Sequence, residues 1–382
     1  MAPETISTRP RALEPALPAT MYVDHDMWLR ERENVLFRSW FCAGRVVDLL
    51  LDRPRRLAVV DVAGESVLLT TDRAGDLHAA YNVCRHRGSQ IVPVAPAGPP
   101  IPPCPAGSLR CPYHSWTYDL DGRLLRAPHT EDIAGFDPEA FALNPVGVDT
   151  WGGFVFVHLT PHEAVPLAEE VSGCADRLRR YPLADLVLGR RFVYDVAANY
   201  KVLAENYNEC YHCGPVHPEL CRLVPSFAAG GDHLDWDQGV PHREGAWTFT
   251  VSGTTQRRPF PLLDEAERSR HKGELVYPNL LLSLSADHVA AFLLLPESEH
   301  RTRVQCDLLF AADEAGRPDF DPDDAAELWD LVNRQDWAIC ESVQRGMSSR
   351  GYVQGWFAPM EEPSADIRRW LLPRLELGGG DG

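Results

Sequence analysis

The sequence contains no long hydrophobic run. Its richest apolar stretch, Leu280–Leu295, is interrupted by Ser283, Ser285, Asp287 and His288, whereas a membrane-spanning helix needs about 20 consecutive apolar residues. The first twenty residues, MAPETISTRPRALEPALPAT, also lack the apolar core of a signal peptide. We therefore expect a cytoplasmic protein that has no membrane partner.

Positive charge is scarce as well. The chain has 37 Lys and Arg against 55 Asp and Glu, which gives a formal net charge of −18 at pH 7. Proteins that bind nucleic acid or anionic membranes present a basic face, so the sequence argues against both partners. The acidity is compatible with a cationic substrate or a basic redox partner. No GxGxxG fingerprint follows a predicted strand, which indicates that the chain does not bind a nicotinamide dinucleotide itself.

The 382 residues, 45% of them hydrophobic, are sufficient for two folded domains. A helix is predicted over 26–39, after a Pro-rich arm. Between about 40 and 161, short apolar runs separated by Gly-containing turns predict an all-β unit. From 162 onward, helices are predicted over 168–181, 200–212 and 323–345. Five runs between them predict an antiparallel sheet: RRFVYDVAA, AWTFTVSG, NLLLSLS, VAAFLLLP and RVQCDLLFA.

Two loops of the β unit combine cysteine with histidine. Cys84 and His86 lie in YNVCRHRGS, and Cys111 and His114 lie in CPYHSWTYDLDG. A Cys2His2 zinc site has these ligand types, but zinc fingers usually pair Cys with Cys and His with His. One Cys and one His in each loop suit a [2Fe–2S] cluster in which both cysteines bind one iron and both histidines the other.

A second cluster of donors lies in ENYNECYHCGPVHP, residues 205–218. By residue type alone, Cys210, His212, Cys213 and His217 could bind zinc. Two histidines with a distant carboxylate would instead hold Fe(II) and leave positions open on the other side. A turn at Gly214-Pro215 would bring His217 back beside His212.

The spacing within this stretch also suggests a polar helix face. Glu205, Glu209 and His212 follow i, i+4, i+7 spacing, so they share one face if 200–212 is helical. Such a face could point inward at a metal, or it could belong to an ordinary solvated helix.

An acid lies within an apolar seam of the predicted helix 323–345. The seam steps by 3, 4, 3 and 4 through Trp329, Val332, Asp336, Ile339 and Val343. A charge in such a seam is costly unless it is paired or binds a metal. The partner of Asp336 could be a metal ion, or an arginine such as Arg334 or Arg345.

The two Cys/His loops, with Trp116 and DLDG after the second, resemble the Rieske motif of Rieske non-haem iron oxygenase α-subunits. ENYNECYHCGPVH resembles their catalytic motif, and RQDW resembles the segment that supplies its carboxylate. The resemblance implies an α+β fold with a Rieske [2Fe–2S] domain at 40–161. It also implies a helix-grip catalytic domain at 162–382, whose antiparallel sheet is flanked by helices, and an arm at 1–39 that packs on it.

The resemblance also implies the ligands. Cys84, His86, Cys111 and His114 would hold the cluster, and His212, His217 and Asp336 would hold a mononuclear Fe(II). Cys210 and Cys213 then become packing residues. A Pro-rich segment between the loops adds Cys104, which we expect to be a bystander because the ligand set is complete without it.

Catalytic roles follow for Glu209 and Asn206. In the wider family the acid three residues before the first histidine bridges to a Rieske histidine of the neighbouring subunit, which implies this role for Glu209 in a homotrimer. Electrons would come from NAD(P)H through a separate flavin and iron–sulfur reductase.

Three further segments, ECYHCGPVHPEL, YPNLLLSLSADHV and CESVQRGMSSRGY, resemble the choline, glycine betaine, carnitine and stachydrine oxygenases. The expected activity is a monooxygenase that hydroxylates a C–H bond of a quaternary ammonium compound or an N-methylated amine. Aromatic faces bind such cations, and five aromatic residues are candidates: Trp236, Trp247, Phe249, Phe260 and Tyr277.

Three other functions stay open at this point. The chain could be an oxygenase for an aromatic or biosynthetic-intermediate substrate. It could be a zinc-stabilised binding protein without redox activity. It could also be an electron-transfer protein whose second domain is catalytically inactive.

Overall fold

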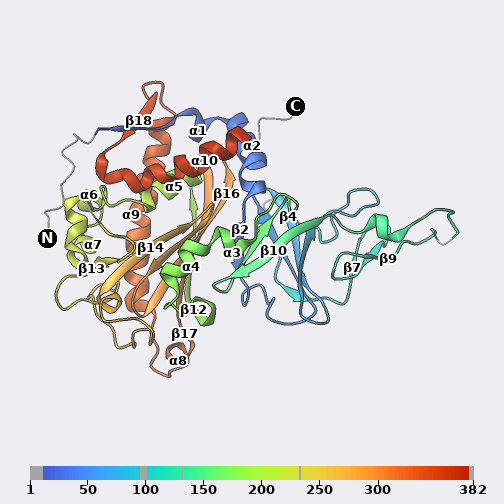
Figure 1. The fold of residues 1–382 in the computed structure, drawn as a ribbon, viewed down its shortest axis with the longest axis horizontal. Helices are drawn as coiled ribbons and strands as arrows, with labels where there is room; N and C mark the ends of the chain where they lie inside the picture. The colour runs from blue at the N-terminus through green and yellow to red at the C-terminus, as the bar shows by residue number, and fades with distance from the viewer. Residues whose placement is uncertain (1–11, 95–100, 131, 232–233, 378–382) are drawn as a thin grey trace, which may run out of the picture.

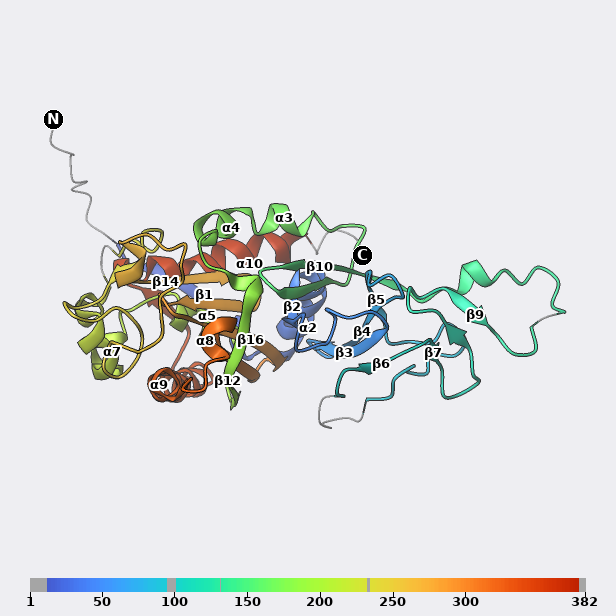
Figure 2. The ribbon, with the colours of Figure 1, turned by 90° about the horizontal axis from the view of Figure 1, so that it is seen from below.

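The protein is described by a computed structural model at residues 12–94, 101–130, 132–231 and 234–377. A larger unit, which contains most of the helices and a six-stranded sheet, lies at the left of Figure 1. A smaller β unit projects to the right and ends in the hairpins around β7 and β9 (Figures 1 and 2). The arrangement confirms the predicted α+β class.

The smaller unit is built on a seven-stranded sheet. In spatial order its strands are β2 (Phe41–Arg45), β11 (Phe154–His158), β10 (Pro145–Trp151), β5 (Leu77–Tyr81), β4 (Glu65–Thr71), β3 (Arg56–Val62) and β6 (Cys104–Pro105). Ala63 and Gly64 join β3 to β4 with φ of 50° and 92°, the left-handed backbone that a two-residue hairpin turn requires. The Asp61 carboxylate accepts the Gly64 N–H at 2.9 Å, which stabilises the turn.

A three-stranded sheet forms the distal end of this unit. Its strands are β7 (Leu109–Arg110), β8 (Thr117–Tyr118) and β9 (Leu124–Arg126). The predicted Asp121-Gly122 hairpin connects the last two, with Gly122 at φ 90°. The second Cys/His loop therefore lies between two short strands, β7 and β8.

The larger unit contains the predicted antiparallel sheet. In spatial order its strands are β12 (Leu186–Val196), β17 (Arg301–Ala311), β16 (His288–Ser298), β15 (Leu280–Leu284), β14 (Arg270–Val276) and β13 (Val240–Pro241). Alternate residues of a strand face opposite sides of the sheet. Accordingly, Phe292 and Leu294 pack in the core that contains α9, whereas Ala291 and Leu293 pack in a second core beneath the other face. Both faces of β16 are covered.

Ten α-helices surround these sheets in the described part of the chain. They are α1 (Thr20–Val23), α2 (His25–Asn34), α3 (Leu167–Glu170), α4 (Ser172–Leu178), α5 (Tyr200–Tyr207), α6 (Cys213–Val216), α7 (Pro218–Leu223), α8 (Ala312–Ala315), α9 (Asp323–Met347) and α10 (Asp366–Leu377). Helix α9 covers one face of the six-stranded sheet (Figure 1). Among the described helices, none combines the length and the apolar character needed to cross a lipid bilayer.

The N-terminal segment packs on the larger unit, although the smaller unit follows it in sequence. Strand β1 (Glu14–Pro18) pairs antiparallel with β18 (Gln354–Phe357) near the C-terminus. A second contact joins this segment to the larger unit. Lys201 Nζ on α5 lies 2.6 Å from Glu31 Oε2 on α2, and both side chains are completely buried. A buried ion pair of this kind fixes the register of two elements.

Reciprocal polar contacts join the two units. Asn279 accepts the Cys42 N–H at 2.8 Å and donates to the Cys42 carbonyl at 2.9 Å. The buried Arg45 guanidinium donates to the carbonyls of Leu183 and Leu186 at 3.1 and 2.7 Å. Because these bonds are buried and satisfied on both sides, the two units form a defined junction.

Helix 26–39 ends earlier than predicted, at Asn34, and helix 168–181 is divided into α3 and α4 and ends at Leu178. Two other element predictions were wrong. Helix 200–212 ends at Tyr207 as α5, and AWTFTVSG forms turns and bends instead of a strand. In the second case the backbone folds back on itself, because Gly253 accepts from Trp247 N and donates to Thr250. Alternation of apolar residues alone does not distinguish such a buried turn from a strand.

Candidate active site

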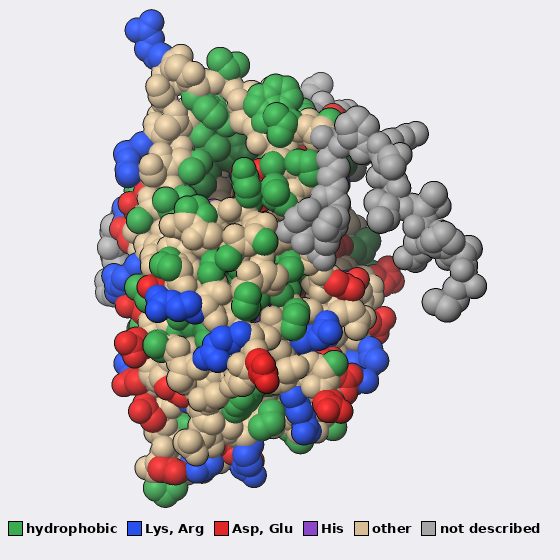
Figure 3. Space-filling view, turned by 90° about the vertical axis from the view of Figure 1, so that its left-hand side faces the viewer, with side chains coloured by type: hydrophobic (Ala, Val, Ile, Leu, Met, Phe, Trp, Pro, Cys, Tyr) green, Lys and Arg blue, Asp and Glu red, His purple; other side chains and the backbone are tan. Residues whose placement is uncertain are grey.

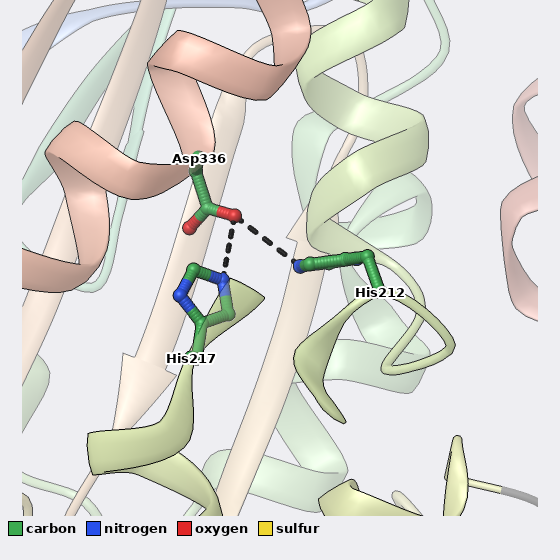
Figure 4. A group of neighbouring side chains, drawn as sticks. All are labelled: His212, His217 and Asp336. Carbon is green, nitrogen blue, oxygen red and sulfur yellow. Dashed lines mark hydrogen bonds and ion pairs between the residues drawn. The ribbon is translucent and has the colours of Figure 1, made fainter. Parts of the chain in front are cut away.

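Three side chains converge at one point of the larger unit. His212, His217 and Asp336 each offer a ligand atom, and these atoms lie within 4.8 Å of one another. As Figure 4 shows, Asp336 points down from α9 and the two histidines come from the segment after α5. Asp336 Oδ1 is 2.9 Å from His217 Nε2 and 3.2 Å from His212 Nε2. This is the two-histidine, one-carboxylate set that suits Fe(II).

The backbone after α5 places the first histidine. Because α5 stops at Tyr207, Glu209 and His212 lie in a turn and do not share a helix face with Glu205, as the spacing had suggested. The Glu209 carboxylate accepts the backbone N–H groups of Tyr211 and His212. Such local side-chain bonds compete with helix formation, which explains why the helix ends where it does.

Both histidines are oriented by a second hydrogen bond. His212 Nδ1 lies 2.6 Å from Glu209 Oε1, and His217 Nδ1 lies 2.7 Å from Gln335 Oε1. Gln335 donates in turn to Glu219 at 3.3 Å. An acceptor on Nδ1 fixes the proton there and leaves Nε2 free for a metal. Gln335 and Glu219 were not predicted, because nothing in their spacing links them to His217.

The charges around His212, His217 and Asp336 favour a bound cation. Burial acts to lower the pKa of His212, but its hydrogen bonds to Asp336 and Glu209 outweigh burial and raise the pKa to about 11. Burial acts to raise the pKa of Asp336, and the hydrogen bonds from both histidines lower it overall. Two carboxylates that converge on buried imidazoles fit a divalent cation.

Neither predicted arginine is the partner of Asp336. Arg334 pairs with Asp330, and Arg345 lies 3.9 Å from Glu341. The buried face of α9 also differs from the predicted apolar seam at its C-terminal end, because Ile339 and Val343 are 38% and 39% exposed. The buried side continues instead through Cys340, Gln344 and Met347, because the face of α9 that covers the sheet turns with the 3.6-residue period.

A cavity of about 330 Å³ adjoins the three ligands. Trp236 and Phe249 of the predicted aromatic set line it, and so does Asn206, whose Nδ2 is 3.3 Å from His212 Nε2. The other members of the set lie elsewhere: Trp247 and Phe260 pack in the second core, and Tyr277 stacks on Trp370 with ring centroids 4.7 Å apart. Five lining aromatics were missed: Tyr207, Phe227, Phe292, Trp329 and Trp337.

Figure 3 shows the end of the molecule that faces left in Figure 1. Hydrophobic side chains gather around a hollow in the upper part of this end, and side chains of both charges cover the lower part. Contiguous apolar surface of this kind is typical of binding sites.

The two cysteines beside His212 are buried thiols. Cys210 and Cys213 are 7% and 3% exposed, and a hydrogen bond to Cys210 together with burial raises the pKa of Cys213. A neutral thiol is a poor ligand, since metals bind the thiolate.

We expect the double variant Cys210→Ser, Cys213→Ser to retain its mononuclear iron at full stoichiometry. It should lose about 1–3 kcal/mol of stability, because two hydroxyls replace packed thiols. Iron content and thermal unfolding would be measured together. Loss of the mononuclear iron from a folded double variant would contradict the assignment of these cysteines to packing.

Glu205 takes part in a different contact from the one that its spacing suggested. Its Oε1 accepts from the Tyr22 hydroxyl of α1 at 2.5 Å, and its backbone carbonyl accepts from Ser364 at 2.7 Å. Burial raises the pKa of Glu205 to about 7, although the Tyr22 hydrogen bond and the charge of Lys201 oppose the change. Glu205 therefore ties the N-terminal segment to α5.

This raised pKa predicts a pH dependence of stability. The carboxyl prefers to be protonated in the folded state, so its contribution is present below pH 4.5 and is lost as pH rises through about 7. We expect Glu205→Gln, which mimics the protonated form, to exceed the stability of the parent protein at pH 8 by about 3 kcal/mol. The two proteins should be equally stable at pH 4.5. Chemical unfolding at several pH values would test this, and parallel profiles would contradict it.

The four predicted cluster ligands meet at the distal end of the smaller unit. Cys84 and Cys111 are 3% and 2% exposed, whereas His86 and His114 are exposed and their ring centroids lie 4.7 Å apart. Among the described residues, only His212, His217 and Asp336 form a group of three or more donors within reach of a single ion. A buried pair of cysteines beside an exposed pair of histidines fits a [2Fe–2S] cluster with two ligands on each iron.

Hydrogen bonds surround the two cysteines. The Tyr118 hydroxyl lies 3.3 Å from Cys84 Sγ. Burial acts to raise the pKa of Cys111, but hydrogen bonds from the N–H groups of Tyr113 and His114 outweigh it and lower the pKa. Donors directed at sulfur favour thiolates and tune the potential of a bound cluster. Cys104, the expected bystander, is exposed in β6.

Two family models match this chain. Residues 183–376 match the ring hydroxylating alpha subunit (catalytic domain) family, and residues 39–137 match the Rieske [2Fe–2S] domain. The carnitine monooxygenase oxygenase subunit of Escherichia coli K12 is 29% identical over 342 residues, which cover 88% of this chain and 85% of that protein. The glycine betaine monooxygenase oxygenase subunit of Pseudomonas aeruginosa PAO1 is 29% identical over 388 residues, covering 91% and 86%.

The fold is similar to solved structures. The quaternary ammonium Rieske monooxygenase CntA, in complex with an inhibitor, superposes with a TM-score of 0.74 at 25% identity, covering 95% of this chain and 96% of that chain. Naphthalene 1,2-dioxygenase from Rhodococcus sp. superposes with a TM-score of 0.70 at 20% identity, covering 95% and 94%.

Proposed function

The chain belongs to the family of ring-hydroxylating oxygenase α subunits, and from this premise we propose that its substrate is a quaternary ammonium compound or an N-methylated amine. It is the terminal oxygenase component of a Rieske monooxygenase, with a [2Fe–2S] cluster, a mononuclear iron and electrons from a separate reductase. The similar proteins named for carnitine, glycine betaine and choline support this substrate class.

The aromatic lining of the cavity beside the three ligands carries the proposal. Trp236 and Phe227 lie with ring centroids 6.2 Å apart and 29° between their planes, and Tyr207 and Phe292 lie 6.2 Å apart. All four rings line the cavity. Ring faces attract a tetraalkylammonium ion, which cannot donate a hydrogen bond.

We assign His212, His217 and Asp336 as the iron ligands. A bound Fe(II) would supply the activation of O₂ that hydroxylation of a C–H bond requires. Glu209 and Gln335 would hold the two imidazoles with Nε2 toward the metal. If the oxidised carbon is an N-methyl group, the hemiaminal product collapses to formaldehyde and a demethylated amine.

We further propose that electrons reach this site from a second copy of the chain. The two Cys/His loops and the three iron ligands lie at opposite ends of one molecule (Figures 1 and 2). Arg85 and Arg87 flank His86 in the sequence, and Arg110 precedes Cys111, whereas the cavity is lined by Glu209 and Glu362. Opposite charges steer such a head-to-tail contact.

A homotrimer would place Glu209 beside a Rieske histidine of its neighbour, and the reductase would draw on NAD(P)H. The domain limits that we propose are 1–39 for the arm, 40–161 for the Rieske domain and 162–382 for the catalytic domain. They agree with the sheets, since β2 to β11 fall within the second range and β12 to β17 within the third.

A substrate panel tests the proposal. The purified protein, supplied with a surrogate reductase, would be assayed against choline, glycine betaine, carnitine and aromatic acids, with formaldehyde release and reductant use scored for each. We expect substrate-dependent reductant use with the ammonium compounds. Coupled hydroxylation of an aromatic acid, with no ammonium compound oxidised, would overturn the proposal in favour of an aromatic substrate.

A further inference from the structure

The two arginines that line the cavity are both paired with carboxylates. Arg177 Nε and Nη2 donate to the two oxygens of Glu274 at 2.6 and 2.7 Å. Arg369 Nη1 donates to Glu362 Oε1 at 2.5 Å. The two parallel bonds to Glu274 satisfy the charge of Arg177, and Arg369 makes a single bond to Glu362. Neither arginine is therefore available, without breaking its pair, to bind an anionic group of a substrate.

Carboxylates outnumber arginines around the same cavity. The lining contains five acids, namely Glu209, Glu274, Asp336, Glu362 and Asp366, and two arginines. The acids therefore exceed the arginines by three negative charges, and a divalent metal ion at Asp336, bound by the neutral form of His212, would leave one. A low-dielectric cavity of this sign attracts a cation and repels a second carboxylate.

One polar side chain in the wall lacks a partner. His271 on β14 lines the cavity, is 4% exposed, and stacks on Phe249 with ring centroids 3.8 Å apart and 5° between the planes. Its Nδ1 is buried without a hydrogen bond to any described residue. Because that atom has almost no accessible surface, a ligand in the cavity would meet the other ring nitrogen, Nε2. Burial and the neighbouring His242 and His288 lower the pKa of His271, so the ring is neutral. A neutral imidazole can hydrogen-bond a hydroxyl or a carbonyl group.

We infer that this cavity selects a cationic N-methylated amine whose second polar group is uncharged, such as an amino alcohol, and discriminates against zwitterions that carry a carboxylate. The inference rests on the proposed function and narrows its substrate class. The aromatic rings would hold the ammonium group, and His271 would bond the hydroxyl. A carboxylate placed there would lack a cationic partner, which is the usual way that a site rejects a close analogue.

Choline and glycine betaine form a matched pair, because they share the trimethylammonium group and differ mainly in hydroxyl against carboxylate. Their binding to the iron-loaded full-length protein would be measured by calorimetry under nitrogen, with tetramethylammonium as the reference. We expect choline to bind at least about tenfold more tightly than glycine betaine. Equal or tighter binding of glycine betaine would overturn the inference and leave the proposed function intact. If none of the three ions binds, the inference and the ammonium proposal both fail.

Two variants separate the contributions. Glu274→Gln removes the bidentate partner of Arg177 and leaves only Asp237, whose Oδ1 lies 3.4 Å from Arg177 Nε. The affinity for glycine betaine should therefore rise at least about fivefold while that for choline falls. His271→Phe keeps the stacking on Phe249, so it should weaken choline about tenfold without changing tetramethylammonium. Unchanged preference in both folded variants would overturn the assignment of these residues.

Glu267→Gln provides a matched control. It weakens the ion pairs of Glu267 with Arg180 Nη1 at 3.0 Å and with Lys272 Nζ at 2.9 Å. None of these three residues is part of the cavity lining. The ratio of choline to glycine betaine affinity should therefore stay at the parent value. A change as large as that of Glu274→Gln would show that general destabilisation, and not the cavity charge, sets the preference.

Discussion

Replacing Asp336 by alanine should remove the mononuclear iron and leave the Rieske cluster spectrum unchanged. The two sites lie in different units, and Asp336 Oδ1 lies 2.9 Å from His217 Nε2 and 3.2 Å from His212 Nε2. Without it, two neutral imidazoles face the metal with no compensating charge. We expect turnover to fall at least about a thousandfold, measured by product formation beside iron content and the cluster EPR signal.

Asp330→Ala is the control for this variant. Asp330 is also an acid on α9, but its carboxylate accepts from Arg334 and from the Tyr194 hydroxyl at 2.8 Å each. Removing it should cost some stability and leave the iron content at the parent level. If Asp336→Ala retained full activity, the ligand assignment would be wrong.

Glu209→Gln should slow electron transfer between the two metal sites while both metals stay bound. The carboxylate fixes the proton of His212 on Nδ1 through the 2.6 Å contact, and an amide can present an N–H there instead. We expect re-oxidation of the reduced cluster in a single turnover to slow by about a hundredfold. Stopped-flow absorbance of the cluster, with O₂ and substrate supplied together, would follow the step.

Glu219→Gln is the control for this variant. Glu219 accepts a hydrogen bond from Gln335, which in turn holds His217, the second histidine of the site. Gln335 still holds His217 Nδ1 in that variant, so cluster re-oxidation should change no more than about threefold. Equal slowing in the two variants would mean that Glu209 acts by holding iron geometry. Normal single-turnover kinetics in Glu209→Gln would exclude it from the electron path.

The candidate ligand residues could be proposed from the sequence because their chemistry is local. Cys84 with His86, and Cys111 with His114, each occupy one short loop, and the donor types alone limit the metals that they suit. His212 and His217 are similarly close in sequence. Asp336 was found because an acid is conspicuous among apolar residues of a long helix, even though Ile339 and Val343 proved to lie on its exposed side.

What could not be predicted depends on contacts between distant residues. Helix α5 stops early because the Glu209 side chain bonds the backbone ahead of it. Trp247 and Tyr277 were candidates for the cavity because they are aromatic. Whether an aromatic residue lines the cavity depends on where its strand or loop packs, and these two pack in the second core and on Trp370. Nothing in the linear sequence marks Gln335, because its partner His217 is more than a hundred positions away. Nothing marks His271 either, because it is distinguished by a buried nitrogen that has no hydrogen bond to a described residue.

The pairing of β1 with β18 has a consequence for synthesis of the chain on the ribosome. Gln354 bonds the Ala16 carbonyl across 338 positions, and Arg368 reaches Glu14 across 354. The strands of the smaller unit, by contrast, all lie between Phe41 and His158. Because domains fold as their segments emerge, the cluster-binding unit can form while the N-terminal strand still waits for its partner. The larger unit, which contains the candidate iron ligands, is completed last. A chain truncated before Gln354 would therefore have a folded cluster-binding unit and a larger unit in which β1 lacks its partner strand.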